Sequence, residues 1–145
     1  MISYTAEGVK MPAIKKRDNN RWLRAVAALY GKRIGDIAYI FCDDRKILEV
    51  NRQYLRHDYY TDIITFDYSE SDIISGDIFI SLDTVRSNSE LFHTDYDTEF
   101  HRVIAHGVLH LCGINDKGPG EREVMEQAEN KALDILRLTY YHEKE

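Results

Sequence analysis

Proline is scarce in this sequence, with only two in 145 residues, and no stretch rich in Pro, Gly or Ser marks a linker. The sequence also contains no internal repeat and no low-complexity segment. A chain of this length falls in the range of one compact domain. Since nothing divides the chain, we expect residues 1–145 to form a single domain.

Cysteines and long apolar runs are equally few. Cys42 and Cys112 lie in separate apolar segments without a C-x-x-C spacing, so we expect two small core residues and no disulfide. No segment approaches the roughly 20 apolar residues that a membrane span needs. Residues 1–11 mix apolar with polar side chains and lack the apolar core of an export signal. We therefore expect a soluble, cytoplasmic protein without a membrane partner.

Charge is unevenly distributed behind a formal net charge of −6. Residues 1–56 hold 12 Lys/Arg and 6 Asp/Glu, whereas residues 57–145 hold 7 and 19. A basic segment can face a polyanion even in an acidic protein, because screening limits the reach of charge to about 8 Å at physiological salt. Solvated helix faces would give the same asymmetry, and charge alone favours that interpretation.

Apolar periodicity predicts helices and strands in mixed order. Helical spacing is present at 20–31, 43–55, 81–92, 94–113 and 119–140. Strand-forming runs occupy 36–42, 62–68 and 74–81, and the last two are predicted to pair as a hairpin. Thr94 followed by Asp97 resembles a capping box, and Val124 is expected to face inward from the last helix. We expect an α+β domain with a small mixed β-sheet packed with about five helices.

The clearest chemistry lies on the predicted helix 94–113. His106 and His110 are one turn apart, so both imidazoles can point at one atom. Gly113 suits a left-handed cap that turns the chain and brings Asp116 within reach of the histidines. The spacing H-x3-H-x5-D predicts a zincin-like site at the end of a core helix, holding one Zn²⁺ or another divalent metal per chain.

An alternative is that both histidines are core side chains bonded to the backbone, with Asp116 only capping the following turn. For an H-x3-H pair alone that interpretation is favoured. The added glycine and the correctly spaced carboxylate favour the metal site instead. Three protein ligands leave one coordination position open, which is typical of a catalytic zinc.

The same spacing occurs in the metzincin motif H-E-x-x-H-x-x-G-x-x-H, with two changes. Gly107 stands where a metalloprotease needs its glutamate base, which disfavours a peptidase. Asp116 replaces the third histidine and should make the metal a weaker Lewis acid. Two histidines and a carboxylate also form the facial triad of non-haem iron oxygenases, so iron chemistry stays open.

Several segments resemble the YbeY family of bacterial endoribonucleases. His106–Gly113 (HGVLHLCG) resembles the start of the family signature HGxLHLxGYDH, and Asn51–Phe66 resembles N-x-x-[YF]-R-x-x-D-x-P-T-[DN]-V-L-S-F. Gly76–Ser81 (GDIFIS) is similar to the family's following strand, and Met125 with Glu126 to its C-terminal helix. The likeness runs over more than half of the chain.

The resemblance implies a metal-dependent endoribonuclease that cleaves single-stranded RNA and matures the 3′ end of 16S rRNA in the small ribosomal subunit. The family's metal histidines fall on His106 and His110, and its third ligand falls on Asp116. Its arginine falls on Leu55, which makes the adjacent Arg56 the candidate catalytic residue. The alternatives are a different metallohydrolase and a non-enzymatic ribosome-assembly factor whose metal only fixes the final helix.

In this hypothesis the metal lowers the pKa of its bound water toward about 7 or polarises a phosphate oxygen. Arg56 neutralises developing charge, and Glu99 or Asp62 orients a liganding imidazole. Tyrosines 54, 59 and 60 are candidate stacking surfaces, although tyrosines beside a strand are more often packing residues. Candidate phosphate contacts are Lys15, Lys16, Arg17, Arg21, Arg24, Arg45, Arg52 and Arg56.

Overall fold

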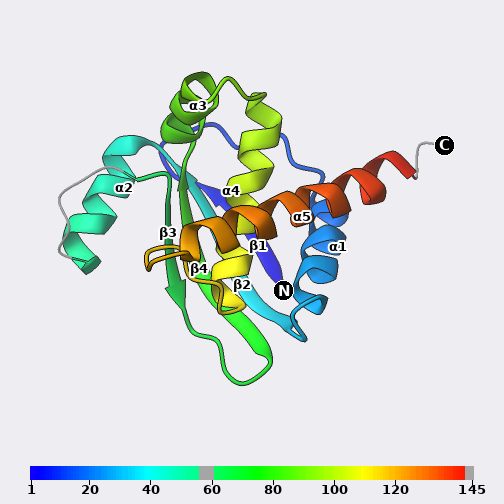
Figure 1. Cartoon of the computed structure of the whole chain (residues 1–145). Helices are drawn as coiled ribbons and strands as arrows, with labels where there is room; N and C mark the ends of the chain where they lie inside the picture. The colour runs from blue at the N-terminus through cyan, green and yellow to red at the C-terminus, as the bar shows by residue number, and fades with distance from the viewer. Residues whose placement is uncertain (56–60, 143–145) are drawn as a thin grey trace.

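A mixed β-sheet lies at the centre of the molecule (Figure 1). The computed structural model describes residues 1–55 and 61–142, apart from the side chains of 140–142. Four strands of the described chain are ordered β1-β2-β4-β3. Strands β1 (Ile2–Ala6), β2 (Arg33–Cys42) and β4 (Ile73–Ser81) are parallel, while β3 (Ile63–Asp67) is antiparallel to β4. The predicted hairpin is therefore confirmed.

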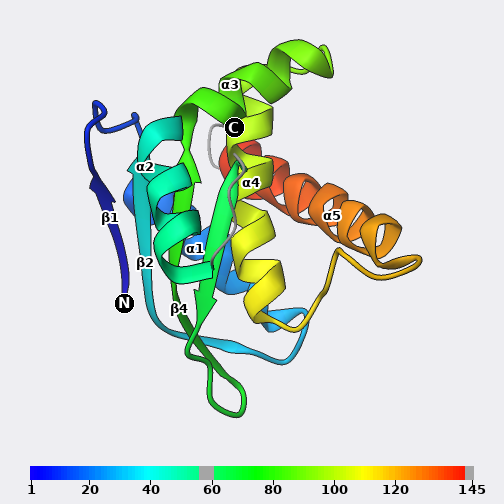
Figure 2. The same ribbon diagram turned by 90° about the vertical axis from the view of Figure 1, so that its left-hand side faces the viewer.

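Strand β1 is missing from the sequence-based prediction. It forms the edge of the sheet beside β2 (Figure 2), with Ile2 paired to Ile37. Its burial alternates, since Ile2 and Tyr4 are buried while Ser3 and Thr5 are exposed. A parallel partner is joined through a long crossover, so no local turn signal accompanies the strand.

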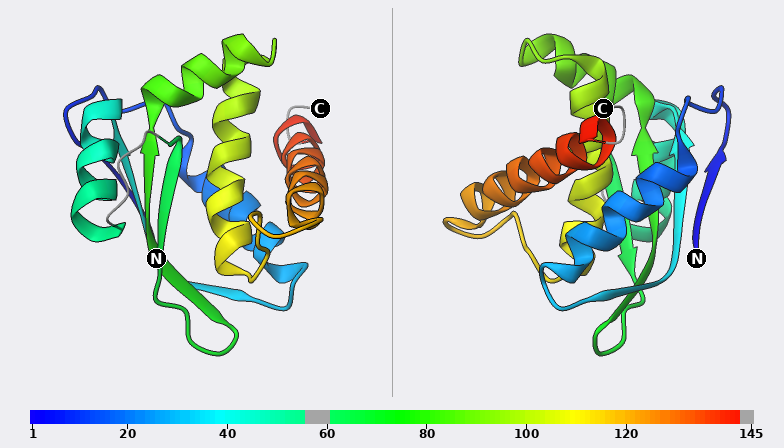
Figure 3. Two further views of the ribbon diagram at one scale, coloured as in Figure 1. Left: turned by 60° about the vertical axis from the view of Figure 1, so that its left-hand side comes forward. Right: turned by 90° about the vertical axis from the view of Figure 1, so that its right-hand side faces the viewer.

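Helices cover both faces of the sheet (Figure 3). One face is covered by α1 (Lys16–Ala28) and α4 (Tyr96–Leu111), and α5 (Glu121–His142) packs on the outer side of these two helices. The other carries α2 (Asp44–Val50), which continues as the π-helical turn η1 (Asn51–Leu55), over a small core of Cys42, Ile47, Val50 and Ile64. Helix α3 (Leu82–Leu91) follows β4 and leads to α4. The expected α+β domain with five α-helices is confirmed for the described ranges.

Two details of the predicted helices were wrong. Asp95, and not Thr94, is the N-cap of α4, because its carboxylate accepts a hydrogen bond from the amide of Thr98. On α5, Val124 is 57% exposed, while the neighbouring Met125 is buried. Val124 is thus outside the inward stripe of this helix, which begins at Met125 and includes Ala128 and Ala132. No helix in the described parts of the chain is both long and apolar enough to cross a bilayer.

Helix α4 is fixed against the sheet along most of its length. Phe100, Val103, Ile104 and Val108 are buried, as the apolar pattern predicts, and the main-chain carbonyl of Ile104 accepts a 2.8 Å hydrogen bond from the hydroxyl of Tyr39. Gly107 allows a close approach to the sheet, since a Cβ there would lie 2.8 Å from Cδ1 of Ile78 on β4. Close contact with β4 holds the second half of α4, where the histidines lie.

Candidate functional site

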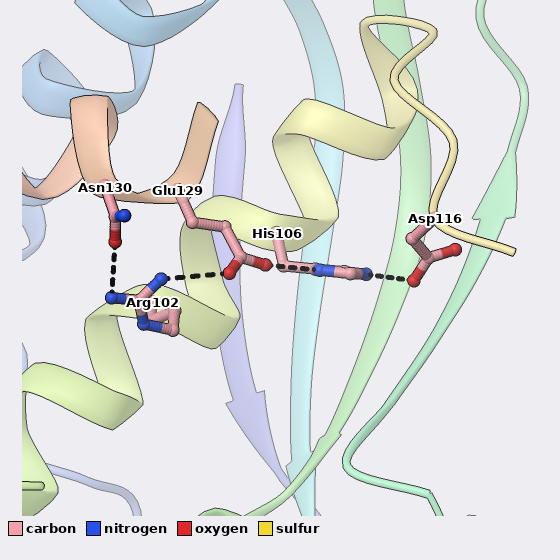
Figure 4. A network of polar contacts seen from close by, with 5 residues as sticks. All are labelled: Arg102, His106, Asp116, Glu129 and Asn130. Carbon is pink, nitrogen blue, oxygen red and sulfur yellow. Dashed lines mark hydrogen bonds and ion pairs between the residues drawn. The ribbon is translucent and has the colours of Figure 1, made fainter. Parts of the chain in front are cut away.

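His106 lies between two carboxylates that come from different parts of the chain (Figure 4). Its Nδ1 is 2.7 Å from Oε2 of Glu129 on α5, and its Nε2 is 3.3 Å from Oδ2 of Asp116 in the loop after α4. All three side chains are largely buried but reach solvent. The imidazole is therefore held at both nitrogens.

Gly113 brings Asp116 back toward the helix. Its φ of +100° lies in the left-handed region, and its amide donates to the carbonyl of His110 at 3.0 Å. The amide of Ile114 donates to the carbonyl of Leu109 at 3.1 Å. These bonds end α4 in the turn that the sequence predicts, and they return the chain toward His106.

Glu129 is itself held in place by Arg102. One guanidinium nitrogen donates to Oε1 of Glu129 at 3.1 Å, and the other donates to Oδ1 of Asn130 at 2.7 Å. Sequence reasoning missed Glu129, naming Glu99 and Asp62 as candidates for this role. A signal was present, because Glu129 follows Met125 by one turn and lies at the edge of the buried stripe of α5.

A cavity of about 610 Å³ opens beside this chain of contacts. It lies between α4, the end of α3 and the start of α5, and five carboxylates line it against two guanidinium groups. Both Glu99 and Asp62 are among its walls. The residues that line it are Asp62, Asn88, Phe92, Thr94, Glu99, Arg102, Val103, His106, Asp116, Arg122, Met125, Glu126 and Glu129.

Burial and crowding of like charge shift the acid groups of this cavity. Burial raises the pKa of Asp62, and the nearby charge of His106 offsets only part of that effect. Burial likewise raises the pKa of Glu99, against the lowering effect of Arg102. Burial acts to lower the pKa of His106, but the hydrogen bond and charge of Glu129, with Asp116 and Asp62, raise it overall.

The other predicted site residues do not join His106 and Asp116 in the described structure. His110 is in the last turn of α4, half-buried, outside the cavity lining, and no contact with His106 or Asp116 is seen among the residues described. Across residues 1–55 and 61–142, no group of three or more His, Cys, Asp or Glu side chains is arranged as a metal site. Arg56, Tyr59 and Tyr60 lie outside the described residues.

The predicted RNA contacts and thiols lie away from the cavity lining. Lys15, Lys16, Arg17, Arg21 and Arg24 are exposed at the start of α1 and along it, and Arg45 and Arg52 are exposed on α2 and η1. Tyr54 is exposed and meets Phe66 edge to face. Both cysteines are free, Cys42 buried and Cys112 half-buried, and burial raises their thiol pKa values to about 12 and about 11.

Comparison with known proteins identifies the family. The model of the family described as "Endoribonuclease YbeY" matches residues 6–137. The chain belongs to the YbeY family. A protein named Endoribonuclease YbeY in Phocaeicola vulgatus is 74% identical over 138 residues, which are 95% of this chain and 100% of that one. The YbeY protein of Porphyromonas gingivalis W83 is 52% identical, over 95% of this chain and 91% of its own.

A solved structure shows the same fold. The solution structure of TM1509 from Thermotoga maritima aligns with a TM-score of 0.67, covering 99% of this chain and 93% of that one. Its sequence identity is 23%, so the likeness concerns the arrangement of helices and strands. The mixed sheet and its helices are therefore a fold that this chain shares with TM1509.

Proposed function

We propose that this protein is a metal-dependent endoribonuclease that cleaves single-stranded RNA, with His106 at its reaction centre. The observation that carries the proposal is the position of His106, fixed by carboxylates at both ring nitrogens and facing a cavity of about 610 Å³. The name of the close relatives, endoribonuclease, supplies the reaction class. We further propose that the protein acts in the cytoplasm, where it matures the 3′ end of 16S rRNA in the small ribosomal subunit.

Two of the proposed donors are spaced to hold a divalent cation such as Zn²⁺. Bonds of about 2.0–2.2 Å in a tetrahedral site place neighbouring donor atoms about 3.4 Å apart. Nε2 of His106 and Oδ2 of Asp116 are separated by 3.3 Å, which matches one edge of such a tetrahedron. His110, one turn along α4, is the proposed third ligand.

The charge of the cavity supports the same assignment. Five carboxylates against two guanidinium groups would repel an RNA phosphate unless a cation were present. When bound, a divalent metal supplies charge neutralisation and an activated water. The acidic lining is thus consistent with a metal-dependent reaction on a polyanion.

Side chains of the protein itself orient the His106 imidazole and hold protons for the reaction. Glu129 accepts the Nδ1 proton of His106, which fixes the tautomer that leaves Nε2 directed at Asp116. Arg102 keeps the Glu129 carboxylate in that orientation. Asp62 and Glu99, whose pKa values are raised by burial, are the groups best suited to hold a proton for the leaving oxygen.

Metal content and RNA cleavage test this proposal together. Protein purified without added metal is analysed for bound ions, which also separates zinc from an iron centre. It is then assayed on a defined single-stranded RNA and on the same sequence as a duplex, with EDTA as the control. We expect cleavage of the single strand only, abolished by EDTA and restored by Zn²⁺.

Three variants locate the metal. His106→Ala, His110→Ala and Asp116→Ala should each lose bound metal and cleavage while keeping the circular dichroism of the fold. Any variant with the full metal content removes that residue from the ligand set. Absence of cleavage in every metal-replete preparation contradicts the enzymatic proposal itself.

One observation favours a second function, that of a non-enzymatic ribosome-assembly factor. The contact of Glu129 with His106 joins α5 to α4, so a metal here would also fix the last helix. Under that function, loss of His110 lowers the melting temperature, and no preparation cleaves RNA. Accumulation of 3′-extended 16S rRNA in cells, with cleavage of that precursor in vitro, distinguishes the enzyme.

A further inference from the structure

An exposed aromatic side chain lies at the end of the cavity formed by α3 and the start of α4. Phe92 follows the last residue of α3, is 56% exposed and forms part of the cavity lining. Its ring makes no aromatic contact with the residues that the structure describes. An exposed ring at the edge of a polar cavity offers a flat apolar surface on which a planar group can pack.

Asn88 lies one turn before Phe92 and lines the same cavity. Residues four apart on a helix share a face, so the amide and the ring point to the same side. The side-chain amide is half-buried, and we find no hydrogen bond from it to any described group. It therefore offers a free donor and a free acceptor beside an exposed ring.

The backbone that carries Phe92 is well fixed. Its amide donates to the carbonyl of Asn88 at 2.9 Å, and the amide of Thr94 donates to the carbonyl of Ser89 at 2.9 Å. Between them His93 takes the left-handed conformation, with φ of 55°. The turn between α3 and α4 thus holds the backbone of Phe92 in a defined position.

This end of the cavity differs from the end at His106. Asn88, Phe92 and Thr94 are uncharged, although Glu99 hydrogen-bonds Thr94. The other four carboxylates of the lining lie just before β3, in the loop after α4 and on α5. Glu99 and His106, both in the lining, are seven residues apart, which is about 10 Å along a helix. The cavity therefore offers an aromatic and amide surface at one end and an acidic, histidine-containing centre at the other.

We propose that Phe92 and Asn88 form a nucleobase subsite, in which one base of the RNA stacks on the ring and its edge bonds the amide. The subsite rests on the proposed function and specifies its substrate as RNA with an unpaired base near the reacting phosphate. Bases splayed from single strands stack on aromatic side chains in this way. An asparagine amide matches the donor and acceptor of adenine N6 and N7, so adenine is the base assigned to the subsite.

Tryptophan fluorescence tests the subsite without cleavage. Trp22 is the only tryptophan of the chain and is fully buried, so Phe92→Trp adds one exposed reporter. The probe is an adenine hexanucleotide with methylphosphonate linkages, which is uncharged, cannot be cleaved and retains its bases. We expect saturable quenching in Phe92→Trp and none in Leu91→Trp, whose position is 69% exposed and outside the cavity lining.

Kinetics test the same subsite on cleavable RNA. Removing one base stack should raise KM for single-stranded RNA about 5- to 100-fold in Phe92→Ala, while Phe92→Tyr and the matched control Leu91→Ala keep the wild-type KM. Asn88→Ala should lose a preference for adenine over uracil next to the cleaved bond. Melting temperatures show whether Phe92→Ala remains folded, and the fluorescence result stands if it does not.

The outcomes separate the subsite from the proposed function. Wild-type cleavage with an unchanged KM in Phe92→Ala, or equal quenching in both tryptophan variants, overturns the subsite and leaves the endoribonuclease in place. Quenching confined to Phe92→Trp in a protein that never cleaves RNA supports the subsite and overturns the enzymatic function.

Discussion

His106 contacts carboxylates from two different parts of the chain. Two carboxylates approach its ring nitrogens at 2.7 and 3.3 Å, and neither is its neighbour in the sequence. In metal-free protein this arrangement suits an imidazolium that donates to both. If Nε2 held a cation, only Nδ1 of His106 would keep its proton, which it would donate to Glu129.

The stability of the metal-free protein should fall with rising pH through the titration of His106. Its pKa in the folded protein is raised above the ordinary 6.5 by the carboxylates. The resulting stabilisation is complete below pH 6.5 and is lost as pH rises through the folded-state pKa. Urea unfolding in EDTA across pH 6 to 9 measures it, and a His106→Gln variant with the same decline would contradict the assignment.

Glu129→Gln should weaken the metal site without removing a ligand. The amide still reaches Nδ1 but carries no charge to raise the basicity of the ring, so metal affinity should fall about 10- to 100-fold. Competition with a chromogenic chelator measures the affinity. Glu123→Gln, at an exposed position of α5 outside the cavity lining, is the matched control and should bind metal as the wild type does.

Arg122 should contribute one phosphate contact. It is exposed at the cavity rim, and no ion pair engages it within the part of the chain that the structure describes. Arg122→Glu should weaken RNA binding and reduce the slope of log K against log salt by about one. Lys131→Glu makes the same charge change on α5 away from the cavity, and an equal effect there would show that only net charge matters.

At the scale of the elements, the packing of α4 on β4 explains why Gly107 stands where a zinc peptidase has glutamate. A Cβ there would be 2.8 Å from Cδ1 and 3.0 Å from Cγ2 of Ile78. The position faces the sheet and is buried, so a carboxylate there could not reach the cavity. Helix packing, as well as chemistry, therefore excludes the peptidase base.

Gly107→Glu should destabilise the protein by about 3 kcal/mol or more, since it overpacks the interface and buries an unpaired charge. Gly107→Ala should have a much smaller effect, because the gain in helix propensity of about 1 kcal/mol opposes the contact with a flexible Ile78 terminus. Chemical denaturation compares the two. Wild-type stability in Gly107→Glu would show that α4 can move off the sheet.

Elements with strong local signals could be predicted from the sequence. The apolar stripe of α4, the caps at Asp43 and Ser81, and the turn at Gly113 are all set by residues within a few positions. The predicted N-cap of α4 was wrong by one residue, because Thr94 and Asp95 are both good N-caps and only the backbone conformation selects between them. Local sequence signals therefore predicted which elements exist more accurately than the residues at which they begin or end.

At the scale of the whole molecule, prediction failed where two distant segments meet. Strand β1 depends on a parallel partner in β2, and Glu129 depends on how α5 crosses α4. The alternation of β1 and the place of Glu129 one turn after Met125 are local signals, but neither identifies the distant partner. The histidine pair and Asp116 could be proposed because one helix and one turn contain them, whereas the carboxylate that orients His106 required the tertiary fold.

The indole of Trp22 on α1 donates a 2.7 Å hydrogen bond to the carbonyl of Ala132 on α5. That anchor is less than one turn beyond Glu129, so α5 is tied to the rest of the protein beside the group that holds the imidazole. Further along, Leu138 is 68% exposed. Because Leu133 is buried and Ile135 and Leu136 pack against the core, an affinity tag attached beyond Leu138 should leave the reaction centre unchanged.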